Sequence, residues 1–117
     1  MNATLSTSST DFDPGKLADL CAATDEATVQ EIVGLFRSDT PQVLASMRTA
    51  QAAGDGDGLR KAAHRLKGAT GTIGLISAQR LCLDIEQAAK AGKVAGAAAL
   101  ITALEAAIER GLVASGR

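Results

Sequence analysis

The single histidine of this chain, His64, lies in the middle of a stretch with strong helical periodicity. At about 100° per residue, five positions share one side of the predicted helix: Leu59, Ala63, Leu66, Thr70 and Ile73. His64, Gly68 and Gly71 share another side, which we expect to face solvent. Glycine in an exposed helix costs about 1 kcal/mol relative to alanine, so we expect both glycines to make room for a partner. The pattern predicts a docking site centred on an imidazole.

Phosphoryl chemistry fits this site. A neutral imidazole is a good nucleophile near pH 7. Arg60 and Lys67 lie about one helical turn on either side of His64, and we expect no acidic group on this face. Cations stabilise a phosphoryl group during transfer, so Arg60 and Lys67 are the predicted phosphoryl-stabilising residues. The alternative is that His64 is an ordinary solvated surface residue.

The sequence lacks the other motifs of a phosphate-transferring enzyme. It contains no nucleotide-binding loop of the GxxxxGK[ST] kind, no carboxylate cluster for Mg²⁺ and no Ser/His/Asp set around the one histidine. We therefore expect no kinase activity, metal site or cofactor of the chain's own. A partner must bring the metal ion, the activated phosphoryl group, or both.

Composition favours one all-α domain. The chain has 117 residues, many of them Ala and Leu, with few aromatic residues and two prolines. A net charge of −1 gives no basic surplus for nucleic acid. Cys21 and Cys82 fall on apolar stripes and are expected to be buried and reduced. Without a membrane-length apolar run or a signal peptide in the sequence, we expect a cytoplasmic protein.

The predicted organisation is a flexible polar tail over residues 1–10 and a single domain over residues 11–117. A short helix starts at Asp13-Pro14, and a second begins at Thr24 or Asp25. The second keeps its apolar phase past Pro41, which predicts one kinked helix or two nearly coaxial helices.

Glycines and cap residues divide the remainder of the chain into three more helices. The histidine helix follows the turn at residues 54–58 and ends at Gly74; the next is capped by Ser77 and ends at Gly92; the last runs from Val94 to Val113. Short connections favour antiparallel neighbours. The expected fold is an antiparallel four-helix up-and-down bundle with a short extra N-terminal helix.

A family resemblance rests on three segments. The run from His64 to Gly74 resembles the H-x-L-K-G signature of histidine-containing phosphotransfer (HPt) domains of two-component phosphorelays. The segments Leu81–Glu86 and Leu35–Pro41 are similar to two further motifs of that family. The resemblance extends from about Leu17 to Ile108.

The resemblance implies that His64 is phosphorylated on Nε2 and exchanges the phosphoryl group with an aspartate of a receiver domain. Lys67 would neutralise phosphoryl oxygens, Gly68 would leave room for receiver loops, and Gly71 would extend that space. Some members orient the imidazole with a glutamine, and here Glu86 stands at that position. The implied partners are response-regulator receivers, which carry Mg²⁺, and a hybrid histidine kinase, and the implied state is a monomer.

Several roles stay open at this level. Glu86 either orients the imidazole or is a solvated surface acid, and Arg60 and Arg65 are either functional or merely solubilising charges. Core packing is favoured for Leu83. Receiver contact is the second interpretation of Ile76, which is kept as a candidate docking residue. The leading hypothesis is a phosphocarrier that relays phosphoryl groups between two receivers through His64. Two other functions compete: a non-catalytic bundle that binds receivers or kinases, and the detached phosphoacceptor and dimerisation domain of a histidine kinase.

Overall fold

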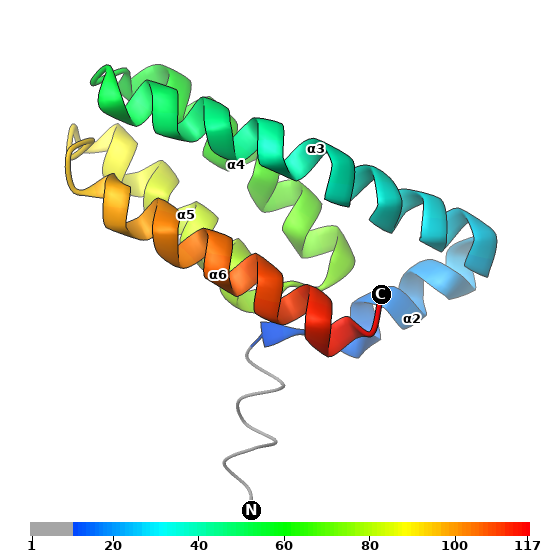
Figure 1. Cartoon of the computed structure of the whole chain (residues 1–117). Helices are drawn as coiled ribbons and strands as arrows, with labels where there is room; N and C mark the ends of the chain where they lie inside the picture. Colours follow the sequence, from blue (N-terminus) through cyan, green and yellow to red (C-terminus); the bar gives the residue numbers. More distant parts are fainter. Residues whose placement is uncertain (1–10) are drawn as a thin grey trace, which may run out of the picture.

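The fold is helical, as the composition predicts. A computed structural model describes residues 11–117, and this part of the chain forms five α-helices. The expected flexible tail, residues 1–10, lies outside the described residues. The helices are α2 (Pro14–Ala23), α3 (Glu26–Ala52), α4 (Gly56–Ile73), α5 (Ile76–Lys90) and α6 (Ala97–Ser115), shown in Figure 1.

The four long helices enclose one apolar core. Both α3 and α5 pack against α4 and α6, and α2 packs against α4 and α3 at the end of the molecule where the chain terminates (Figure 1). Each long helix contributes the apolar stripe seen in its sequence, with fully buried side chains such as Met47, Leu59, Ile85, Ile101 and Leu104. Within residues 11–117, no helix has the length and apolar character needed to cross a membrane.

Helix α3 is one continuous helix that contains Pro41. Of the two predicted caps, Asp25 is the one used, and its side chain accepts a hydrogen bond from the backbone N–H of Thr28 at 2.7 Å. The residue before the proline, Thr40, is buried and donates its hydroxyl to the carbonyl of Phe36 at 2.6 Å.

The turn between α4 and α5 is tight. Gly74 has φ +92°, and the carbonyl of Thr70 accepts the N–H groups of Gly74 and Leu75 at 3.0 and 2.9 Å. This left-handed glycine confirms the predicted end of α4. The predicted Ser77 cap is wrong: α5 begins at Ile76 after a fully buried Leu75, and the Ser77 hydroxyl bonds Asp11 at 3.2 Å. Helix α6 starts at Ala97, later than predicted, because the chain turns through residues 91–96.

The segment before α2 is attached to this turn. Asp13 caps α2 through the N–H of Gly15 at 2.9 Å, as predicted, and its own N–H donates to the carbonyl of Gly74 at 2.8 Å. The nearly buried Asp11 carboxylate accepts from Nε of Arg110 on α6 at 3.3 and 3.4 Å. These contacts fix the start of α2 relative to α4, α5 and α6.

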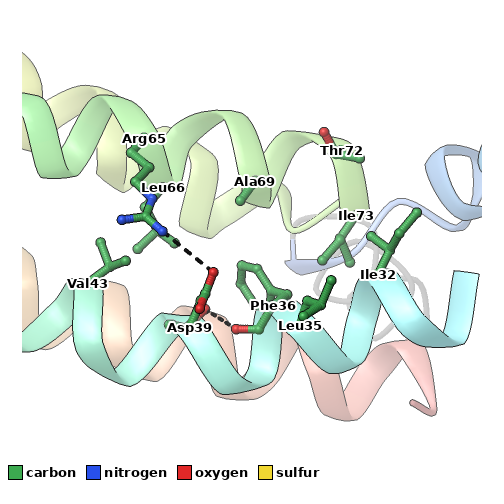
Figure 2. A pocket seen from close by; sticks show the side chains of 11 residues that line it. Ile32, Leu35, Phe36, Asp39, Val43, Arg65, Leu66, Ala69, Thr72 and Ile73 are labelled. Carbon is green, nitrogen blue, oxygen red and sulfur yellow. Dashed lines mark hydrogen bonds and ion pairs between the residues drawn. The ribbon is translucent and has the colours of Figure 1, made fainter.

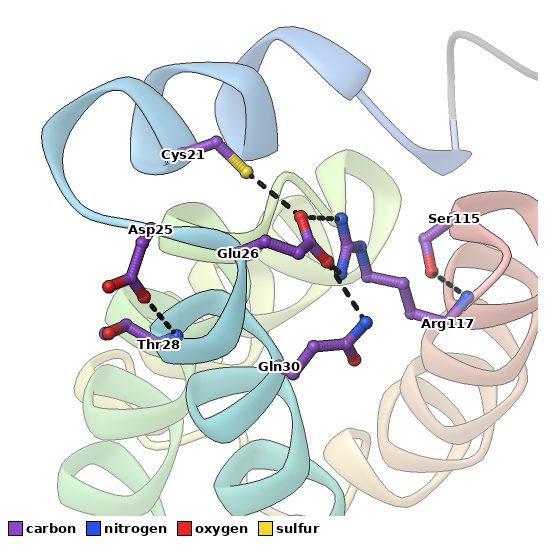
Figure 3. Close-up of polar contacts among 7 residues, drawn as sticks. All are labelled: Cys21, Asp25, Glu26, Thr28, Gln30, Ser115 and Arg117. Carbon is purple, nitrogen blue, oxygen red and sulfur yellow. Dashed lines mark hydrogen bonds and ion pairs between the residues drawn. The ribbon is translucent and has the colours of Figure 1, made fainter.

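A second polar cluster fixes the end of α2 (Figure 3). Two guanidinium nitrogens of Arg117 bind the Glu26 carboxylate at 2.6 and 3.1 Å, and Gln30 donates to it at 3.0 Å. The Cys21 thiol lies 3.5 Å from the same carboxylate. Cys21 is therefore half-buried in a polar cluster, contrary to the expectation of a buried core thiol, whereas Cys82 is buried as predicted.

Candidate functional site

His64 projects from α4 into solvent. Asp55 caps this helix by accepting the N–H of Gly58 at 2.9 Å, and the stripe from Leu59 to Ile73 is buried. The opposite side of the helix is left outside the core, and the His64 side chain is 64% exposed. The predicted orientation of α4 is confirmed.

Glu86 of α5 holds the imidazole. Its Oε2 lies 2.9 Å from Nδ1 of His64, and its Oε1 accepts from Nζ of Lys67 at 2.8 Å. Glu86 is only 4% exposed, so it is not a solvated surface acid. The expectation that the histidine face carries no acidic group is wrong, because an acid from the neighbouring helix reaches it.

The Glu86 carboxylate is held in its charged form. The hydrogen bond from Lys67 lowers the pKa of Glu86 below its ordinary value, and the bond to His64 lowers it further, against the opposing effect of burial. An ionised carboxylate can only accept hydrogen bonds. The neutral imidazole therefore carries its proton on Nδ1, which leaves the lone pair of Nε2 free.

Lys67 is less free than predicted. Its side chain is 28% exposed, and its ammonium group is paired with Glu86. Lys67 and His64 lie one turn apart on α4, and each binds a different oxygen of one carboxylate. The Lys67 ammonium is thus held next to the imidazole.

The two glycines differ in their surroundings. A Cβ on Gly68 would meet nothing within 4 Å, as the predicted open surface requires. A Cβ on Gly71 would lie 3.0 Å from Cδ of Gln79 on α5 and closer still to its amide nitrogen. Gly71 therefore makes room for a side chain of this protein. The sequence places Gln79 on one stripe of α5 with Ile76 and Leu83 but gives it no role, because its position over Gly71 depends on how α4 and α5 pack.

Both arginines near His64 form ion pairs. Arg60 binds Asp57, one turn earlier on α4, at 3.0 Å. Arg65 lies 3.5 Å from Asp39 of α3 and, as Figure 2 shows, spans the mouth of an apolar groove between α3 and α4. Neither guanidinium group is bound to the His64–Glu86–Lys67 cluster.

The α3–α4 groove was not predicted. Its volume is about 260 Å³, and apolar side chains of both helices line it, including Ile32, Phe36 and Ala69 (Figure 2). Leu35, which is 65% exposed, stands at its edge. The signal in the sequence was the apolar Leu35, which lies outside the core stripe of α3.

Two further residues were assigned from the sequence of α5. Ile76 is 38% exposed at the start of the helix, and its contact with a receiver stays a prediction. Leu83 is 39% exposed, so its predicted place in the core is wrong. The buried side of α5 is instead formed by Ala78, Cys82, Ile85, Glu86 and Ala89.

Metal binding has no support in this part of the chain. Among residues 11–117, no group of three or more His, Cys, Asp or Glu side chains could hold a metal ion. The polar cluster of the site, consisting of His64, Lys67 and Glu86, offers one imidazole, one ammonium and one carboxylate. Such a set suits proton placement and phosphate contact.

Comparison with known proteins agrees with this geometry. The family model described as Hpt domain matches residues 31–111. The crystal structure of histidine-containing phosphotransfer protein B from Pseudomonas aeruginosa PAO1 is similar to this chain, with a TM-score of 0.81 and 28% sequence identity. The match covers 90% of this chain and 88% of that one. A comparison with curated protein sequences gave no match. Because the family model spans more than half of the sequence, the chain belongs to the Hpt domain family and is a histidine phosphotransfer protein of two-component phosphorelays.

Proposed function

We propose that His64 is the residue that carries the phosphoryl group, on Nε2. The observation that supports this most directly is the contact between Nδ1 and the Glu86 carboxylate at 2.9 Å. It leaves Nε2 as the nucleophilic nitrogen, on a side chain that is largely exposed.

The proposed reaction moves one phosphoryl group between two side chains. The Nε2 lone pair attacks the phosphorus atom of an aspartyl phosphate on the receiver, an N–P bond forms, and the P–O bond to the receiver aspartate breaks. The aspartate leaves as a carboxylate, and the proton on Nδ1 stays in its hydrogen bond to Glu86. In the reverse direction a receiver carboxylate attacks phosphorus and the electron pair of the N–P bond returns to Nε2.

Lys67 supplies positive charge to the transferred group. Its ammonium group has three N–H donors, so it can turn toward a phosphoryl oxygen while it stays near Glu86. Stabilising charge on the phosphoryl oxygens is the main contribution a protein makes to such a transfer. Arg60 adds only longer-range positive charge in this proposal, because its guanidinium group pairs with Asp57.

The docking surface in this proposal surrounds Gly68. The absence of a side chain there lets the receiver approach α4 next to His64, and Ile76 offers an apolar contact from α5. The α3–α4 groove lies on the other side of α4, and Thr72 borders both it and a hollow that contains Gly68. Gly71 acts indirectly, through the side chain of Gln79.

The broader assignments belong to the same proposal. Residues 11–117 are one domain, whose helices α3 to α6 form an antiparallel four-helix up-and-down bundle; the short turns at residues 53–55 and 74–75 support this topology. The partners are receiver domains, which hold Mg²⁺, and a hybrid histidine kinase. The protein acts as a cytoplasmic monomer without enzymatic activity of its own or contact with nucleic acid.

The test is transfer of label from phosphorylated receivers. A panel of receiver domains carrying ³²P on aspartate is mixed with the wild-type chain, and acid-labile, base-stable label on the chain is measured. His64→Gln should abolish this label and keep the helical circular dichroism. Lys93→Gln, an exposed change in the turn between α5 and α6, is the control and should label normally. Label on His64→Gln, or no label on wild type from any receiver, contradicts the proposal.

A further inference from the structure

A solvent-open hollow lies next to the histidine on the surface shared by α2, α4 and α5. Its volume is about 510 Å³. Helix α4 contributes Gly68 and Thr72 to its lining, α2 contributes Lys16, Asp19 and Leu20, and α5 contributes Gln79. Gly68 lines the hollow and is one helical turn from His64, so a partner docked over Gly68 borders this hollow.

The amide end of Gln79 occupies space that Gly71 leaves open. A Cβ at position 71 would lie 3.0 Å from the Gln79 Cδ and closer still to its amide nitrogen, so the amide would have to move. The backbone of Gln79 is fixed as well, since its N–H donates to the carbonyl of the fully buried Leu75 at 2.9 Å. The helix thus fixes where the Gln79 side chain starts, at the edge of the docking surface, and its amide end lies over Gly71.

The hydrogen-bonding groups of this amide are unused within the described chain. The Gln79 side chain makes no hydrogen bond to any of residues 11–117. It offers two N–H donors and one carbonyl acceptor. The hollow is also lined by the ammonium side chain of Lys16 and the carboxylate side chain of Asp19, both from α2. A neutral group with both a donor and an acceptor matches a peptide group better than a charged side chain.

We propose that Gln79 is an affinity-determining residue: its side-chain amide hydrogen-bonds the main chain of the docked receiver, beside the transferring phosphoryl group. Gly71 leaves the space that this amide occupies. This inference rests on the proposed function, since it takes the receiver to dock over Gly68. The occupant of the hollow is a receiver loop whose backbone N–H and C=O groups pair with the Gln79 amide. Gln79 touches neither His64 nor the phosphoryl group, so its effect is on binding.

The experiment uses the receiver that exchanges phosphoryl groups fastest with the wild-type chain. The dissociation constant for this receiver is measured by calorimetry, and the single-turnover transfer rate is measured at saturating receiver. Gln79→Ala should raise Kd about three- to tenfold, as expected for the loss of one or two neutral hydrogen bonds. The saturated transfer rate and the midpoint of thermal unfolding should not change. Gln87→Ala makes the same chemical change at another exposed position of α5 and should leave Kd unchanged.

A double-mutant cycle tests whether the space at Gly71 positions the Gln79 amide. Gly71→Ala should displace the amide and raise Kd by a similar factor, and Gly71→Ala with Gln79→Ala should bind no more weakly than either single variant. Equal Kd values for Gln79→Ala and wild type overturn the inference, as does a purely additive double variant. A lower saturated rate or a lower unfolding midpoint in Gln79→Ala also overturns it, since it indicates a different role. These outcomes require a wild-type chain that transfers; a wild type that never accepts label contradicts the proposed function instead.

Discussion

Glu86 contacts His64 across two helices, 22 residues apart in sequence, with 2.9 Å between Oε2 and Nδ1. The other oxygen of the same carboxylate holds Lys67 at 2.8 Å. One buried acid therefore fixes both the proton of the imidazole and the position of the nearest cation. This arrangement links the nucleophile and the charge-stabilising group before any partner binds.

Replacing Glu86 by Gln should weaken the contacts with His64 and Lys67 while keeping a side chain of the same size. The amide can still accept from Nδ1, but it can also turn its NH₂ group toward the ring, and it no longer attracts Lys67 as an ion. We expect His64 to be phosphorylated about tenfold more slowly at pH 7.5, roughly the effect of losing one charge-assisted hydrogen bond. The measurement is the transfer rate at saturating receiver, with ¹⁵N NMR of the imidazole to follow the Nδ1–H tautomer. An unchanged rate and an unchanged tautomer population would show that the contact has no role in positioning.

Acid should remove the stabilising contribution of Glu86. The pKa of Glu86 is lowered in the folded protein, with Lys67 as the main cause. A lowered folded-state pKa gives stability that is present above the unfolded pKa of about 4.3 and is lost as pH falls through the folded value. The difference in unfolding free energy between wild type and Glu86→Gln should therefore shrink as pH falls from 5 toward 3. Urea titrations at pH 5, 4 and 3 test it, and a difference that grows between pH 5 and pH 3 contradicts the assigned direction.

Lys67→Ala should affect both transfer and stability. Loss of the ammonium group should slow transfer by about one to two orders of magnitude, the kinetic equivalent of about 1.5–3 kcal/mol. The variant also removes one of the two groups that bond the buried Glu86 carboxylate and leaves it His64, which should cost about 1–3 kcal/mol of unfolding free energy. Lys61→Ala, which breaks only an exposed pair with Asp57, serves as the control and should cost less than about 1 kcal/mol. Normal transfer by a destabilised Lys67→Ala would make Lys67 a packing residue.

The pattern of the sequence predicted the core but not the contacts between helices. Periodicity correctly placed His64 on the side of α4 opposite Leu59 and Ile73. The positions of the apolar residues within α4 are enough to decide which side of this helix is buried. It could not decide between the two roles of Glu86, because that depends on the rotation of α5 against α4. The same rotation explains why Leu83 is exposed and why Gln79 covers Gly71. Cys21 fits an apolar stripe, yet its neighbours are Glu26 and Arg117, which no local pattern connects.

The two thiols should react with an alkylating or disulfide reagent at different rates. Burial raises the pKa of Cys82 to about 12, so almost no thiolate is present near pH 8. Desolvation and the neighbouring Glu26 also raise the pKa of Cys21, which is nevertheless partly exposed. We expect a thiol-specific disulfide reagent at pH 8 to label Cys21 slowly and Cys82 only after unfolding by urea. Mass spectrometry of the labelled peptides distinguishes the two sites, and rapid labelling of Cys82 in the folded protein would contradict its assigned burial.

Two glycine-to-alanine changes should have opposite effects. Gly68 lies on the exposed side of α4, where an added methyl group would meet nothing within 4 Å, so Gly68→Ala should stabilise the protein by up to about 1 kcal/mol. Gly111 on α6 faces the Leu75 side chain and the Asp11 carbonyl, which would lie 2.6 and 2.9 Å from a Cβ, so Gly111→Ala should destabilise by about 1–3 kcal/mol. Thermal and urea unfolding measure both changes.

Gly68→Gln should fold normally yet transfer phosphoryl groups poorly, because its side chain fills the space that the receiver needs. Normal transfer by Gly68→Gln would show that the receiver does not dock over this glycine.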